Sequence, residues 1–179
     1  MSIAENVKQV KENMAAAARR CGREPDGILL CAATKMNDAS RVREAIAAGV
    51  DVCGENRVQE LTEKLGQGAY SACPLHFIGH LQKNKVKYIV GKVSLIHSAD
   101  SLELIGVIDK RAAAMGVTQD ILLEVNIGGE TAKSGFAPDK LGEVLPRMAD
   151  FRAVRVRGLM AIPPICENME ENRPYFRTM

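Results

Sequence analysis

Apolar and polar positions follow two different periodicities along this chain. Short apolar runs predict buried strands, and the longer segments between them carry apolar residues at every third or fourth position, which predicts amphipathic helices. The predicted strands are 27–34, 51–53, 75–78, 93–97, 121–127 and 154–160. The predicted helices are 3–21, 40–48, 55–66, 83–90, one that begins at Asp100, one that ends at Met148 and one that begins near Asn168.

Several predicted helices begin with residues that can cap them. Asn37-Asp38 precede the 40–48 helix, and their side chains can accept hydrogen bonds from its first N–H groups. Asp100 is followed three residues later by Glu103, which is the spacing of a capping box. Glu55-Asn56 are interpreted as the start of the helix that follows them.

The alternation of strands and helices predicts an α/β fold with parallel strands joined by right-handed crossovers. Both an open doubly wound sheet and a closed (β/α) barrel fit this pattern. A nucleotide-binding open sheet would carry a GxGxxG turn after its first strand, whereas this chain has Lys35-Met36-Asn37-Asp38 there, which favours the barrel. A TIM-type barrel has eight strands and about 250 residues. With 179 residues, we expect a single domain over 1–179 with about six of the eight strands.

Composition narrows the classes of function. The net charge is only +2, and no apolar run is long enough to cross a membrane, so neither nucleic acid nor a membrane is an expected partner. Tryptophan is absent and aromatic residues make up 4%, which weakens a model of base stacking. The five cysteines are odd in number and form no CxxC pair, so a metal site and a disulfide framework are both unexpected and a cytoplasmic location fits best.

Lys35 is the first candidate for chemistry, because it ends an apolar run at the edge where an α/β barrel keeps its active site. Partial burial would lower the pKa of its amine and provide the neutral form that attacks a carbonyl. One interpretation is a lysine that forms a Schiff base. The other is a lysine whose stem covers apolar surface while its ammonium reaches solvent.

Further polar residues follow the other predicted strands and would meet at the same mouth of a barrel. His80 and Gln82 are stronger candidates than Glu55-Asn56, since they lie in a loop. The 128–138 loop is long for a strand-to-helix connection, and long loops are often functional. The basic 83–92 segment could instead bind phosphate, nucleic acid or a protein, although a solvated helix face explains its lysines equally well.

Six segments together resemble one known family, the pyridoxal phosphate homeostasis proteins (YggS-like, PROSC). The resemblance runs across nearly the whole chain, and the stretch HFIGHLQKNK is its most specific part. The segments are Ala33-Thr34-Lys35, Cys53 to Glu60, His76 to Lys85, Ile96 to Ser101, Val125-Asn126-Ile127 with Lys133 to Phe136, and Arg157 to Ile162.

The resemblance implies a barrel related to the N-terminal domain of alanine racemase. It implies that pyridoxal 5′-phosphate (PLP) is bound as an aldimine on Lys35, that Asn56, His80 and Met160 line the pocket near the ring, and that Lys133 is an auxiliary lysine. It also implies a role in vitamin B6 homeostasis without established turnover, with PLP-dependent apoenzymes as recipients of the cofactor. Members of the family are monomers.

Two further expectations come from comparing the sequence with the family. The C-terminal segments that supply most phosphate contacts in the family are absent from this sequence, so we expect a truncated barrel with weaker PLP binding and a tendency to oligomerise. The alternative function is a racemase-like PLP enzyme or a Schiff-base aldolase. Racemisation needs a second acid/base residue, and the three tyrosines, Tyr70, Tyr88 and Tyr175, fall in helical or loop segments.

Overall fold

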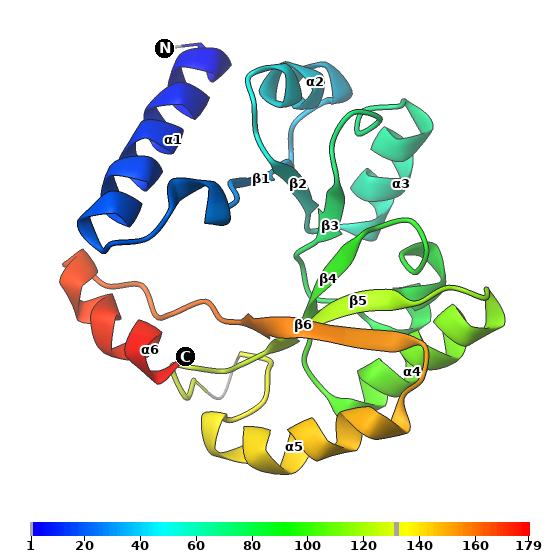
Figure 1. The fold of residues 1–179 in the computed structure, drawn as a ribbon. Helices are drawn as coiled ribbons and strands as arrows, with labels where there is room; N and C mark the ends of the chain where they lie inside the picture. Colours follow the sequence, from blue (N-terminus) through cyan, green and yellow to red (C-terminus); the bar gives the residue numbers. More distant parts are fainter. Residues whose placement is uncertain (1, 131–132) are drawn as a thin grey trace. The chain divides into compact units, whose positions relative to one another are not determined.

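The computed structural model describes residues 2–130 and 133–179, in which six strands alternate with helices (Figure 1). The strands are β1 (Cys31–Ala33), β2 (Val52–Glu55), β3 (Leu75–Phe77), β4 (Leu95–Ala99), β5 (Gln119–Glu124) and β6 (Val154–Met160). The α-helices are α1 (Ile3–Arg20), α2 (Ala39–Ala47), α3 (Val58–Gly66), α4 (Leu102–Ala114), α5 (Leu141–Arg147) and α6 (Arg173–Thr178). The strands follow chain order in one sheet, which confirms the expected α/β fold with six strands.

Short 3₁₀ helices account for several of the connections. They are η1 (Pro25–Gly27), η2 (Lys83–Tyr88), η3 (Pro138–Lys140), η4 (Met148–Asp150) and η5 (Met169–Asn172). The helix predicted over the basic 83–90 segment is found as η2, a 3₁₀ helix that ends at Tyr88. Two of its lysines, Lys85 and Lys87, lie 5.9 and 5.0 Å from the centre of the Tyr88 ring.

The chain forms two compact units, Met1–His76 and Phe77–Met179. In the first unit β1 and β2 pair in parallel, with Cys31 opposite Val52 and Ala33 opposite Gly54. Helix α1 begins with a capping box formed by Ser2 and Glu5. The core of this unit includes Val42, Val52, Leu61 and Tyr70, all buried.

Strand β1 differs from its prediction in both length and burial. It spans Cys31–Ala33 rather than 27–34, and both of its end residues are exposed. The run is shortened because Pro25 begins η1 and because the Asp51 carboxylate, at 2.8 Å, accepts the hydrogen bond of the Leu30 N–H. An N–H that donates to a side chain is not available to a strand ladder.

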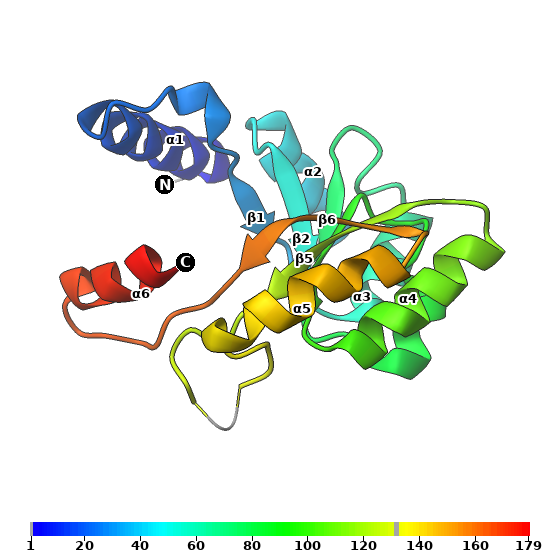
Figure 2. The same ribbon diagram turned by 60° about the horizontal axis from the view of Figure 1, so that its bottom comes forward.

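In the second unit β4, β5 and β6 pair in parallel, with β5 in the middle. Helix α4 packs against these strands and buries Leu104, Ile105 and Ile108 (Figure 2). An extended segment follows β6 and leads to α6 (Figure 2). The bounds of β6 agree with the predicted 154–160 strand, whereas β4 and β5 are displaced by about two residues from their predictions.

Two predicted helix starts are wrong, and one is confirmed. Asp38 caps α2 as expected, because its carboxylate accepts the Arg41 N–H. The cap of α4 is Ser101 rather than Asp100, since the Ser101 hydroxyl accepts the Leu104 N–H. Helix α3 begins at Val58, and Glu55 belongs instead to β2.

All five cysteines are free thiols. Cys53 is fully buried in β2, and burial raises the pKa of its thiol to about 12, with a further contribution from neighbouring Cys73. Among the residues that the structure describes, no helix has both the length and the apolar content needed to cross a membrane.

Candidate functional site

Lys35 lies in the turn that follows β1 and is exposed. The expectation that the Lys35 side chain would be partly buried is wrong. Strand β1 has only three residues, and its first and last residues are themselves exposed. The next residue, Met36, has a φ of +60°, a left-handed conformation that is uncommon for a residue with a side chain. The Met36 side chain is 84% exposed, so its own packing does not hold this conformation.

Hydrogen bonds from α3 hold the backbone on both sides of Lys35. The Lys64 ammonium donates to the Thr34 carbonyl oxygen at 2.8 Å, and the Met36 N–H donates to Glu60 Oε2, also at 2.8 Å. The Asn37 side-chain amide donates to the Lys35 carbonyl oxygen at 3.0 Å. The polar backbone groups around Lys35 are thus bonded, while its own amine is left accessible.

Beneath this turn lies a buried polar cluster that we define as Thr34, Glu55, Lys64 and Tyr70. Glu55 is fully buried, and its Oε1 accepts hydrogen bonds from Lys64 at 2.5 Å, Thr34 at 2.8 Å and Tyr70 at 3.1 Å. Burial raises the pKa of the Tyr70 hydroxyl, and the Glu55 carboxylate raises it further. Tyr70 therefore stays neutral and acts as a donor to Glu55.

Sequence reasoning missed this cluster. The sequence pattern indicates a helix start at Glu55 and places Tyr70 in a helical or loop segment, and neither points to a shared buried cluster. A signal that could have pointed to it is the four-residue spacing of Glu60 and Lys64, which places the two residues on one face of the predicted 55–66 helix.

Asn56, a predicted cofactor contact, is joined to the Lys35 turn through Glu55. Its N–H donates to Glu55 Oε2 at 3.2 Å. Its side-chain oxygen is buried and has no partner among the described residues. A buried acceptor without a partner is costly, so this atom is suited to a polar ligand.

In the second unit, His80 lies close to two polar side chains. Its Nδ1 is 3.5 Å from Asp100 Oδ2 and 3.4 Å from the Ser134 hydroxyl. Burial raises the pKa of nearby Glu124, and the charge of Asp100 adds to the rise, while His80 opposes it. The structure thus brings His80 together with the loop that carries Lys133.

Lys133 pairs with Glu130, with 2.6 Å between the ammonium and the carboxylate. The Asn126 side-chain amide holds this loop by donating to the carbonyl oxygens of Glu130 and Lys133 at 2.8 and 3.1 Å. Two loop residues, Thr131 and Ala132, lie outside the described residues. Met160 ends β6, and its carbonyl oxygen accepts the Val125 N–H at 2.8 Å, next to Asn126.

Buried oxygens without a partner recur at the carboxyl ends of strands. Besides Asn56, they are the Ser98 hydroxyl in β4 and the Asn126 side-chain oxygen after β5. A buried acceptor without a partner fits a ligand that offers a hydrogen-bond donor, and in the first unit Asn56 is such a residue. Within residues 2–130 and 133–179, no cluster of His, Cys, Asp or Glu side chains is suited to hold a metal ion.

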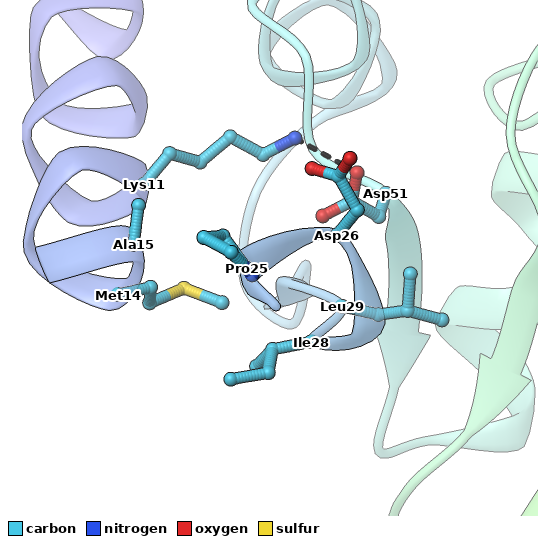
Figure 3. A pocket seen from close by; sticks show the side chains of 8 residues that line it. All are labelled: Lys11, Met14, Ala15, Pro25, Asp26, Ile28, Leu29 and Asp51. Atoms are coloured by element: carbon cyan, nitrogen blue, oxygen red, sulfur yellow. Dashed lines mark hydrogen bonds and ion pairs between the residues drawn. The ribbon is translucent and has the colours of Figure 1, made fainter. Parts of the chain in front are cut away.

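Two cavities of the first unit lie at opposite ends of β1. One, of about 340 Å³, is lined by Leu29, Lys11 and Asp51, and Figure 3 shows Lys11 reaching Asp51 from α1. Leu29 precedes β1 and Asp51 precedes β2, so this cavity lies at the amino ends of the two strands, whereas Lys35 follows the carboxyl end of β1. A smaller cavity of about 180 Å³ is lined by Thr34 and Asn37, which flank the Lys35 turn, and by Arg41.

Comparisons with known proteins agree on one family. The family model for the alanine racemase N-terminal domain matches residues 6–178, which confirms the expected fold class. A protein of Aquifex aeolicus named pyridoxal phosphate homeostasis protein is 43% identical over all of this chain and 78% of its own length. Its namesake in Escherichia coli K12 is 37% identical over 90% of this chain and 70% of its own length.

A solved structure gives a further match. PipY of Synechococcus elongatus, described with PLP bound, superposes with a TM-score of 0.81 at 30% identity. The match covers 98% of this chain and 77% of PipY.

Proposed function

The chain belongs to the pyridoxal phosphate homeostasis proteins, and from that premise we propose that it binds PLP and carries it on the amine of Lys35. The observation that carries the proposal is the exposed Lys35 amine at the end of β1, on a turn fastened to α3. PLP supplies a reactive aldehyde when it is bound. The Lys35 amine adds to the aldehyde carbon and one water molecule leaves, so a covalent link forms without oxidation or reduction.

We also propose supporting roles for the other predicted cofactor contacts. Asn56 offers an unpaired buried oxygen, and His80 offers a ring held near Asp100 and Ser134. Met160 would supply apolar contact from the end of β6. Lys133 is the auxiliary lysine of this proposal, and its amine is paired with Glu130.

The proposed role is homeostasis of PLP without amino-acid turnover, as the names of the curated relatives suggest. A racemase-like enzyme would need a second acid/base group, and the Tyr70 hydroxyl is occupied by Glu55 inside the buried cluster. We propose PLP-dependent apoenzymes as recipients of the cofactor. The cytosol is the proposed location, since all five cysteines are free thiols.

Titration with PLP followed by borohydride reduction tests the proposal. Peptide mass mapping is expected to place the pyridoxyl group on Lys35 in the wild type and in the matched control Lys133→Ala. Lys35→Ala is expected to lose the absorbance of the covalent form. Unchanged absorbance and affinity in Lys35→Ala would show that the assignment of Lys35 is wrong.

The absence of turnover needs a separate measurement. The loaded protein is incubated with L-alanine in deuterated buffer, and exchange of the α-proton is followed by NMR. We expect no exchange above the level given by free PLP. Exchange at about 1 per second or faster, ordinary for an enzyme, would contradict the homeostasis role.

A further inference from the structure

The Lys35 turn is held mainly by side chains of α3 rather than by its own packing. Glu60 and Lys64 lie four residues apart and bond the residues that follow and precede Lys35. Lys64 also donates to Glu60 at 3.2 Å, so the two contacts form one connected unit. This arrangement fixes the backbone from which the Lys35 side chain starts.

We propose that Glu60 and Lys64 are positioning residues, which hold the Lys35–Met36 turn in the left-handed shape that presents the Lys35 amine to the aldehyde of PLP. The inference rests on the proposed function and deepens it, because it assigns roles to two residues that act through the backbone on either side of Lys35. Neither residue was among the candidates from the sequence.

We call the hydrogen bonds from Glu60 and Lys64 to the turn the brace. The left-handed conformation of Met36 is the reason that the turn needs such support. A residue with a side chain adopts this conformation at a cost, and such a backbone persists only where surrounding contacts hold it. Here Met36 is exposed, and its N–H donates to Glu60. The turn is also closed by a backbone bond, in which the Asn37 N–H donates to the Thr34 carbonyl oxygen at 3.3 Å. The Glu60 bond is thus the one of these contacts that a side-chain substitution on α3 can remove. Hydrogen bonds to a charged acceptor are stronger than those between neutral groups.

The brace is itself anchored in the interior of the first unit. Lys64 is 6% exposed and bonds the fully buried Glu55, which in turn accepts from Thr34 and Tyr70. Glu60 also forms an ion pair with Arg57, with 3.8 Å between Arg57 Nη1 and Glu60 Oε1. The position of Glu60 is therefore set by contacts on both sides, although the residue lies near the surface.

A fixed backbone matters because the lysine stem is long and flexible. Restricting its starting point reduces the volume that the amine samples, which raises the effective concentration of the amine at the aldehyde carbon. Loss of the brace should therefore slow covalent capture of PLP more than it lowers the stability of the fold.

The test compares three variants with the wild type. Glu60→Ala removes the acceptor of the Met36 N–H, and Glu60→Gln keeps an oxygen at that place. Glu63→Ala is the matched control: the same substitution on an exposed residue of the same helix, whose carboxylate accepts a hydrogen bond from the Gln67 side-chain amide at 3.4 Å. Three quantities are measured: amide hydrogen exchange at Met36, the rate of covalent PLP capture at Lys35, and the melting temperature.

In Glu60→Ala we expect Met36 exchange to rise by about tenfold or more and capture at Lys35 to slow by about tenfold. Glu60→Gln should recover most of both losses. Glu63→Ala should match the wild type in exchange and capture rate. The melting temperature of Glu60→Ala should fall only slightly below that of Glu63→Ala, because Lys64 loses one acceptor but keeps its bonds to Glu55 and Thr34.

The outcomes separate the two proposals. Unchanged Met36 exchange in Glu60→Ala would overturn the brace itself. Faster exchange with an unchanged capture rate would leave the brace as a structural feature and overturn its positioning role. No capture at Lys35 even in the wild type would overturn the proposed function and the positioning role together, while the exchange measurement would still report on the brace.

Discussion

Glu55 and Lys64 are two charged residues held almost entirely out of water. Removing two charges from solvent is expensive, and the attraction between them offsets that cost only when their remaining donors and acceptors are bonded. The buried cluster meets this condition, because Lys64 also donates to Thr34 and Glu60, and Glu55 also accepts from Tyr70. The pair is therefore stable only as a whole.

Breaking the pair on one side should be more damaging than replacing both partners. Lys64→Met leaves the Glu55 charge buried without compensation, and we expect a loss of about 3–5 kcal/mol in the free energy of unfolding. The double variant Glu55→Gln/Lys64→Met should lose clearly less, because no charge remains. Urea unfolding of both variants measures the difference, and equal losses would show that the charge pair is not the source of the effect.

At the residue scale, the sequence indicated Lys35 but not the residues that hold it. Lys35 follows an apolar run, which is a local pattern. The buried cluster joins residues 9, 15 and 21 positions apart, which only the folded chain brings together. Glutamate is common at helix starts, and that tendency concealed the role of Glu55 as the last residue of a strand.

At the element scale, the 128–138 loop depends on one glycine. Gly135 has a φ of +114°, and a Cβ at that position would lie 2.8 Å from the Asn126 nitrogen and 2.9 Å from the Glu124 carbonyl oxygen. The loop returns here to the end of β5, where the Phe136 N–H donates to Glu124 at 2.8 Å. Close approach of two backbones leaves no room for a side chain.

Gly135→Ala should therefore destabilise the second unit by about 1–3 kcal/mol and loosen the contact between Ser134 and His80. The control is Gly142→Ala, in α5, where a Cβ meets nothing within 4 Å. That change should be neutral or slightly stabilising, since alanine favours the helix. Urea unfolding and limited proteolysis near Lys133 measure both, and equal behaviour of the two variants would contradict the packing argument.

A helix or strand could be predicted where apolar and polar residues repeat with one regular spacing along its whole length. The 154–160 strand alternates valine and arginine and was located with its bounds. The length of strand β1 was overestimated. Its apolar run does not reveal that the Leu30 N–H donates to the Asp51 carboxylate instead of to a neighbouring strand. The cap of α4 was misplaced by one residue, since Asp100 and Ser101 are both good caps and local geometry decides between them.

At the scale of the whole molecule, carboxylates set the response to acid. Burial alone would raise the pKa of Asp51, but hydrogen bonds from Lys11 and the Leu30 N–H hold it below its usual 3.8. The Met36 N–H, with help from Lys64 and Arg57, holds the pKa of Glu60 below its usual 4.5. The stability that these groups contribute is present above the usual values and is lost as the pH falls through the lowered ones.

Glu124 acts in the opposite direction. Burial and the charge of Asp100 raise its pKa above 4.5, although His80 opposes the rise. The folded state therefore favours the protonated form of Glu124. Its contribution to stability is largest in acid and is lost as the pH rises through the raised value.

We expect the urea midpoint to fall between about pH 7 and about pH 3, because protonation of Asp51 and Glu60 removes the stability that they contribute when ionised, with Glu124 acting against the fall. Asp51→Asn should reduce the fall, since it removes one group that stabilises only when ionised. Glu124→Gln should enlarge the fall by raising stability at neutral pH. A fall that is the same in all three proteins would mean that other groups govern acid unfolding.

The order of the strands could be predicted from the sequence because each strand is followed by a segment that crosses back to the next. Alternation of this kind leaves few topologies open, and the simplest one, β1 to β6 in chain order, is the one found. The residues that could contact a cofactor are harder to predict, since all but Met160, which ends β6, lie in turns or loops whose shape depends on contacts made elsewhere.

The buried free thiol of Cys53 can be used to measure how often strand β2 opens. Cys53 is shielded from solvent and its raised pKa keeps it protonated, so an alkylating reagent can react with it only during transient opening of the strand. Exposed Cys21 should react at once and so provides an internal reference for the reagent. Glu55 lies two residues after Cys53 in the same strand. The delay between the two labelling events therefore measures how often β2, which carries Glu55 of the buried cluster, opens in the native protein.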